Sequence, residues 1–96
     1  YFSLAGLIKS NIKGAKAAIE TYEREALAEA KRRSYDGVVC GHIHYPALRE
    51  EGGLRYANCG DWIENCTALV EDHHGVMRLL HHSDKVAWQE LQTASA

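Results

Sequence analysis

The stretch Val38-Val39-Cys40-Gly41-His42-Ile43-His44 decides how this chain is interpreted, because an apolar run ends there in two closely spaced histidines. The turn-forming pair Asp36-Gly37 precedes the run, which is short, β-branched and not alternating. Such a run is typical of a central strand that is covered on both faces. In open α/β sheets, ligands bind beyond the carboxyl ends of the strands, which is where His42 and His44 fall.

The two histidines are candidate metal ligands, because neutral imidazole is the commonest metal ligand in proteins. In an extended segment, their i, i+2 spacing would point both side chains to one face. In a tight loop they can also converge, since Gly41 lets the backbone approach closely. Spacing alone leaves two alternatives open, a metal site at His42 and His44 or a hydrogen-bonded loop pair.

The remaining sequence predicts one long helix and three further strands. Apolar residues recur at steps of three and four over residues 11–33, the spacing of one helical face. They are Ile12, Ala15, Ile19, Tyr22 and Ala26. Strands are expected at residues 38–40, 54–58, 67–71 and 76–80, with a hairpin turn at 72–75. Residues 46–53 are expected to form a polar loop, residues 85–91 a short helix, and residues 92–96 a frayed end.

Length and composition indicate one small domain without an electrostatic case for binding nucleic acid. The chain has 96 residues, and its net charge is −2. No run approaches the roughly 20 apolar residues of a membrane helix. The odd number of cysteines, three, without CxxC spacing favours reduced thiols and a cytoplasmic setting. The chain begins at Tyr1 rather than Met, which suggests the tail of a longer protein.

A second polar segment, Asn58-Cys59-Gly60-Asp61-Trp62-Ile63-Glu64, supplies further candidates. Asn58 and Asp61 are candidate substrate-binding residues in a polar pocket; alternatively, both belong to a turn whose side chains bond local backbone. A zinc site built from four side chains is another alternative. Its ligands would be Cys40, His42, Cys59 and Cys66. The pairs at residues 73–74 and 81–82 chelate poorly as dipeptides, since adjacent strand residues face opposite ways.

Two segments together resemble the C-terminal part of calcineurin-like metallophosphoesterases. The first is Val38-Val39-Cys40-Gly41-His42-Ile43-His44-Tyr45-Pro46, which contains the family's Gly-His-x-His metal motif. The second runs from Tyr56 to Glu71 and includes Asn58-Cys59-Gly60-Asp61-Trp62-Ile63-Glu64-Asn65-Cys66-Thr67. The subgroup that this pair resembles most is the UDP-2,3-diacylglucosamine pyrophosphatase type, a hydrolase of the lipid A pathway.

The resemblance implies a dinuclear centre in which His42 binds one divalent ion and His44 the other. The ions would be manganese, with iron, zinc or magnesium as alternatives, and such pairs clamp a phosphoryl group and generate a hydroxide. The family's Asp-x-His, Gly-Asp and Gly-Asn-His motifs are absent, and no histidine precedes His42. The chain is therefore expected to be one partial domain over residues 1–96, the C-terminal half of an α/β fold (α+β as a fragment) built as an αββα sandwich. Alone, it is expected to bind metal weakly and to lack hydrolytic activity.

Several functional expectations follow from the resemblance. The parent protein would cleave a phosphodiester or pyrophosphate bond of a nucleotide-linked substrate in the cytoplasm. A lipid substrate would bring it to the surface of the inner membrane. The incomplete fold predicts self-association or binding to a complementing N-terminal half, because exposed strand edges pair with other chains. The alternatives are a non-catalytic α/β association module and a small zinc-binding domain.

Overall fold

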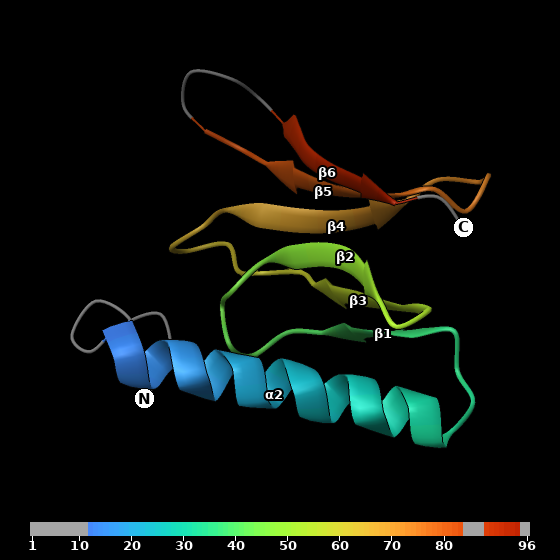
Figure 1. The fold of residues 1–96 in the computed structure, drawn as a ribbon. Helices are drawn as coiled ribbons and strands as arrows, with labels where there is room; N and C mark the ends of the chain where they lie inside the picture. The colour runs from blue at the N-terminus through green and yellow to red at the C-terminus, as the bar shows by residue number, and fades with distance from the viewer. Residues whose placement is uncertain (1–11, 84–87, 95–96) are drawn as a thin grey trace.

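One helix and six strands form three layers in the part of the chain that the structure describes (Figure 1). The computed structural model describes residues 12–83 and 88–94, with side chains from residue 14 onward. The elements are α2 (Ile12–Arg32), β1 (Gly37–Cys40), β2 (Ala47–Glu51), β3 (Leu54–Asn58), β4 (Thr67–Glu71), β5 (Met77–His81) and β6 (Gln89–Ala94). The fold is therefore a mixed α+β arrangement, in which a helix covers one sheet and a second sheet covers the other face.

Helix α2 confirms the helix expected at residues 11–33, but its buried face agrees only in part with the predicted one, since Glu23, Leu27 and Ala30 are also buried. Ala15 and Ile19 are buried, while Tyr22 and Ala26 are half-buried. The helix contacts β1 and β3. Its exposed last turns carry ion pairs from Glu29 to two arginines, at residues 32 and 33. The last turn is basic, which suits the negative end of the helix dipole.

The first sheet has the order β1-β3-β2. Strands β1 and β3 are parallel, with Cys40 opposite Asn58, whereas β2 and β3 form an antiparallel hairpin in which Ala47 is also opposite Asn58. The hairpin turns at Gly52 and Gly53, whose φ values of 60° and 80° are those that a two-residue type I′ turn requires. The amino ends of β1 and β3 therefore lie at one end of the sheet, and their carboxyl ends lie at the other.

The second sheet has the order β4-β5-β6 and is antiparallel throughout. Apolar side chains between the sheets form the core, with Leu48, Ala57 and Leu79 buried and Leu69, Met77 and Ala94 packed against them. Burying a leucine side chain stabilises a fold by about 1.5–3 kcal/mol. This shared core, together with contacts from β5 and β6 to β2, holds the second sheet against the first.

A buried ion pair joins the helix to the first sheet. Glu23 is 8% exposed, and both of its carboxylate oxygens accept hydrogen bonds from Arg49, at 3.1 and 3.3 Å. The Arg49 guanidinium also lies over the ring of Tyr56, 4.8 Å from its centroid. The Glu23 carboxylate holds the pKa of Arg49 above its usual range. Polar pairing thus complements the apolar packing between helix and sheet.

The strands expected at residues 38–40, 54–58, 67–71 and 76–80 are observed, but four other expectations are wrong. Within the described residues, β1 is an edge strand, and Val39 is 61% exposed because the second sheet contacts β2 rather than β1; the expectation that residues 38–40 are covered on both faces is wrong. Residues 47–51 form β2 rather than a polar loop, because Leu48 is buried in the core. Residues 89–94 form β6, because they pair with β5, so the short helix expected at 85–91 and the frayed end expected at 92–96 are both wrong there. Residues 85–87 and 95–96 lie outside the described residues.

Candidate functional site

The loop at residues 41–46 carries the two candidate metal ligands and bridges the end of β3. Strands β1 and β2 flank β3 in the sheet, so the chain that joins them passes over the carboxyl end of β3. That end is Asn58, which is fully buried. The loop that contains His42 and His44 and the polar segment that begins at Asn58 are therefore neighbours in space.

His42 and His44 both have left-handed backbone conformations, with φ of 70° and 56°. Ile43, between them, is 3% exposed, and its N–H donates to Gly41 O at 2.8 Å, which closes a tight turn. The buried isoleucine anchors the loop, while His42 is exposed and His44 is half-buried. The histidines thus lie in a tight loop rather than in an extended segment.

Asn58 supports this loop from below. Its amide Nδ2 donates to Gly41 O at 3.2 Å and to the Tyr56 hydroxyl at 3.4 Å, and its Oδ1 accepts from Gly60 N at 3.0 Å. The Tyr22 hydroxyl also donates to Gly41 O, at 3.3 Å. Asn58 therefore connects the histidine loop to the chain that leaves β3. These contacts are all within the protein, so the predicted contact between Asn58 and a substrate stays a prediction.

Asp61 organises the loop at residues 61–65. Its carboxylate accepts hydrogen bonds from the backbone N–H groups of Ile63, Glu64 and Asn65, and from the Asn65 side chain at 2.8 Å. Partial burial alone would raise the pKa of the Asp61 carboxyl, but these hydrogen bonds outweigh it and hold the pKa below the usual range. Asp61 thus has the turn-stabilising contacts of the structural alternative, and its predicted substrate contact stays a prediction.

The same loop reaches His44. Asn65 Nδ2 donates to His44 O at 2.8 Å, and Glu64 Oε1 lies 3.8 Å from His44 Nδ1. Neither Glu64 nor Asn65 was among the site residues expected from sequence. The available signal was their position, because Glu64 ends the polar segment that contains Asn58 and Asp61, and Asn65 directly follows it. The arrangement can orient the His44 imidazole, since a carboxylate at one ring nitrogen favours the proton there and leaves the other nitrogen as a donor to a metal.

The cysteines do not assemble with the histidines. Within residues 12–83 and 88–94, no three His, Cys, Asp or Glu side chains form a group that could hold a metal ion. The zinc set of Cys40, His42, Cys59 and Cys66 is therefore not assembled, and all three cysteines are free and half-buried. Burial raises the pKa of the Cys40 thiol, and its hydrogen bond with Tyr22 offsets this only in part.

The described residues supply the two imidazoles but not a complete dinuclear centre. A metal pair needs several further ligands, including bridging ones, and these 79 described positions bring no third ligand to His42 and His44. This part of the chain therefore does not by itself fit the metal pair that the resemblance implies. Of the other histidines, His73 and His74 are exposed in the turn between β4 and β5, whereas His82 N donates to Cys66 O at 3.0 Å, beside the end of the loop at residues 61–65.

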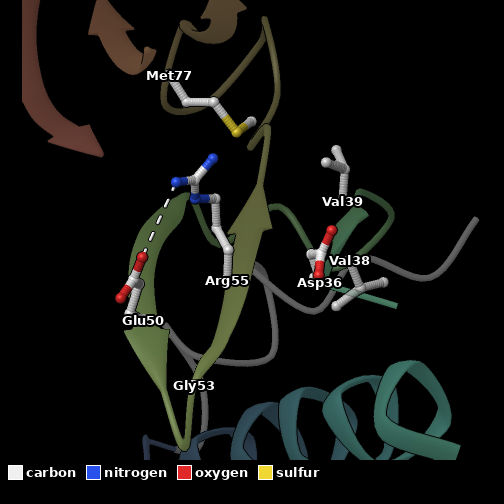
Figure 2. Close-up of a pocket in the computed structure, with 8 residues that line it drawn as sticks. Asp36, Val38, Val39, Glu50, Gly53, Arg55 and Met77 are labelled. Atoms are coloured by element: carbon white, nitrogen blue, oxygen red, sulfur yellow. Dashed lines mark ion pairs between the residues drawn. The ribbon is translucent and has the colours of Figure 1, made fainter. Parts of the chain in front are cut away.

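A hollow of about 420 Å³ lies at the opposite end of the first sheet (Figure 2). The amino ends of β1 and β3, the hairpin turn and the start of β5 line it, with Asp36, Gly37, Val38, Val39, Glu50, Gly53, Arg55 and Met77. Arg55 is largely buried, and its Nη2 lies 3.9 Å from Glu50 Oε1. The hollow is thus separate from the histidine loop, and sequence reasoning had not identified it.

Comparison with known proteins finds no matching family model, no similar curated protein and no similar solved structure. Among the described residues, no helix has the length and apolar character needed to cross a membrane.

Proposed function

We propose that this chain is the C-terminal part of a dinuclear metal-dependent phosphohydrolase that cleaves a phosphodiester or pyrophosphate bond. The resemblance favours UDP-2,3-diacylglucosamine as substrate, manganese as the metal, and a cytoplasmic enzyme that meets its lipid substrate at the inner membrane. In this proposal His42 and His44 each contribute one ligand. The remaining ligands come from outside the described residues, from a complementing N-terminal half. The two metal ions would supply a polarised phosphoryl group and a hydroxide nucleophile.

The observation that carries the proposal is the backbone of the histidine loop. Each left-handed non-glycine residue costs about 1–2 kcal/mol. Among the described residues, Ser34, His42, His44 and Cys66 adopt this conformation, and only the two histidines do so within one short loop. His42 and His44 both accept this conformation in one tetrapeptide, at the carboxyl end of β1. Strained residues of this kind cluster at functional sites, where the surrounding structure holds them in place.

The surroundings of the loop support the same assignment. Asn58 holds Gly41 from below, Asn65 holds His44 O, and Glu64 faces the His44 ring. The two asparagines hold the backbone of the loop, and the Glu64 carboxylate, 3.8 Å from Nδ1, is placed where the partner of a metal-ligating imidazole lies. We therefore assign Asn58, Glu64 and Asn65 as positioning residues in the proposed site.

The test is a titration of the chain with Mn²⁺, followed by the imidazole resonances in ¹H–¹⁵N spectra. The paramagnetic ion should broaden His42 and His44 before the four histidines at positions 73, 74, 81 and 82. His42→Ala should weaken the broadening of His44, whereas His73→Ala, in an exposed turn, should leave it unchanged. Uniform broadening of all histidines, or broadening that starts at His73, would contradict the assignment.

A second test concerns activity. The chain alone should not hydrolyse bis(p-nitrophenyl) phosphate with added Mn²⁺. The reading frame upstream of Tyr1 should encode Asp-x-His and Gly-Asn-His motifs. Hydrolysis by the purified chain that disappears in His42→Ala would refute the need for a complementing half, and an upstream frame without these motifs would refute the parent function.

A further inference from the structure

The described strands leave four sheet edges, at β1 and β2 in one sheet and at β4 and β6 in the other. Proteins protect such edges from pairing with other chains by charged side chains, proline or bulges. Three of the edges carry such protection. Strand β2 contains Arg49, Glu50 and Glu51, β4 ends in Glu71, and β6 contains Glu90 and a register shift against β5. Strand β1 is Gly37-Val38-Val39-Cys40, and apart from its short length of four residues it has no such protection.

The backbone of β1 presents a complete set of hydrogen-bonding groups on its outer side. Arg55 N donates to Asp36 O and Cys59 N donates to Cys40 O, both at 3.0 Å, so alternate residues of β1 face β3. Residues between them face the other way in a strand. The N–H and C=O groups of Gly37 and Val39 therefore point away from β3, toward the open edge.

We propose that this edge binds a second copy of the chain, with the two β1 strands antiparallel about a two-fold axis at Val38. In that register Gly37 of each copy lies opposite Val39 of the other. Each strand is self-complementary because its outward residues, Gly37 and Val39, are two positions apart. The two N–H and two C=O groups of each strand are then all paired, in four interchain hydrogen bonds. The product is a continuous six-stranded sheet, and the inference does not rest on the proposed phosphohydrolase function.

The side chains favour the same register. Val39 is 61% exposed and extends toward the side of the sheet where Arg55 and Met77 lie, at the mouth of the hollow beside β1 (Figure 2). A Cβ at Gly37 would lie 2.4 Å from Arg55 O, so this position has no room for a side chain of its own. In the proposed dimer, Val39 of the second copy lies opposite Gly37, and Gly37 in turn pairs with Arg55. That valine would cover the hollow and remove apolar surface of both valines from water.

The test is sedimentation equilibrium of the purified chain at concentrations up to about 0.5 mM, where even a weak dimer is populated. The expected mass is twice the 10.7 kDa of one chain. Val39→Pro removes an outward donor without removing a bond to β3, and Val39→Lys adds a charge to the edge. Each should raise the dissociation constant at least about tenfold. The matched control is Val70→Lys, an exposed valine on the β4 edge, which should leave it unchanged.

Amide exchange fixes the location of the interface independently of the variants. The Gly37 and Val39 amides should exchange more slowly as the concentration rises, and circular dichroism should show that Val39→Lys is folded. Three results would overturn the proposal. They are a monomeric chain at the highest concentration, a dimer that survives Val39→Lys or dissociates in Val70→Lys, and a dimer in which the Gly37 and Val39 amides exchange freely. A monomer would indicate that another protein segment, rather than a second copy, covers β1.

Discussion

Replacing Asn58 by alanine should be one of the most destabilising single changes near the histidine loop. The side chain is fully buried, and alanine cannot replace any of its three hydrogen bonds, to Gly41 O, the Tyr56 hydroxyl and Gly60 N. Gly60 N loses its acceptor in a buried place, which costs about 1–3 kcal/mol. Gly41 O keeps the Tyr22 hydroxyl, so its loss is smaller, about 1 kcal/mol. The expected decrease in the free energy of unfolding is about 2–4 kcal/mol.

Urea unfolding followed by the helical circular dichroism signal measures this change. With a slope of about 1 kcal/mol per molar urea, the midpoint should fall by roughly 2–4 M. Asn65→Ala is the matched control, because Asn65 is only half-buried and its hydrogen bonds to His44 O and to Asp61 are part-buried. Its cost should stay near 1 kcal/mol.

The effect of losing the Asn58 amide should be concentrated at the histidine loop. Asn58→Asp keeps an acceptor for Gly60 N but places a carboxylate oxygen against Gly41 O, so amide chemical shifts at residues 41–44 should change more than that at Gly60. The reasoning is refuted if Asn58→Ala costs less than about 0.5 kcal/mol, the size of an ordinary surface substitution. It is also refuted if Asn65→Ala costs as much as Asn58→Ala.

Two further predictions concern backbone strain and pH. Gly60→Ala should cost roughly 3 kcal/mol, because φ is 74° and the new Cβ would lie 2.0 Å from Thr67 Oγ1. Gly52→Ala, with a φ of 60° and no atom within 4 Å of its Cβ, should cost only about 1 kcal/mol by the same urea assay. Burial, partly offset by the hydrogen bond with Asn58, raises the pKa of Tyr56 from 10.0 to about 12. The folded state therefore favours the neutral phenol, and the stability that Tyr56 contributes below pH 10 should be lost between about pH 10 and 12. Urea midpoints across this range should fall less steeply in Tyr56→Phe, and an equal slope in both proteins would contradict this prediction.

Local patterns in the sequence were sufficient for helix α2 and for four of the strands. The 3.6-residue spacing of small and apolar residues identified the first half of the buried face of α2, at Ala15 and Ile19, but not its continuation at Leu27 and Ala30. The other two strands depend on contacts between distant segments. In β2 only Leu48 is fully buried, in a strand that is otherwise rich in charged residues. A strand at Gln89–Ala94 requires the neighbouring β5, which supplies its hydrogen-bond partners. The signal that could have revealed β2 is the Gly52-Gly53 pair, which suits a two-residue hairpin turn.

The candidate site was partly predictable for a topological reason. The sequence placed His42 and His44 just after β1, but it could not show that β2 returns on the far side of β3. That strand order makes residues 41–46 cross above Asn58, because Cys40 and Ala47 are both opposite Asn58 in the register. Two polar segments separated by β2 and β3 therefore meet, and Gly41 O becomes the acceptor for the Asn58 amide. The left-handed conformations of His42 and His44 are consistent with this crossing, since a loop of six residues must turn tightly to span a strand. The geometry of the histidines thus depends on the sheet order, and a change that shifts β2 relative to β3 should disturb the histidine loop as directly as a change within it.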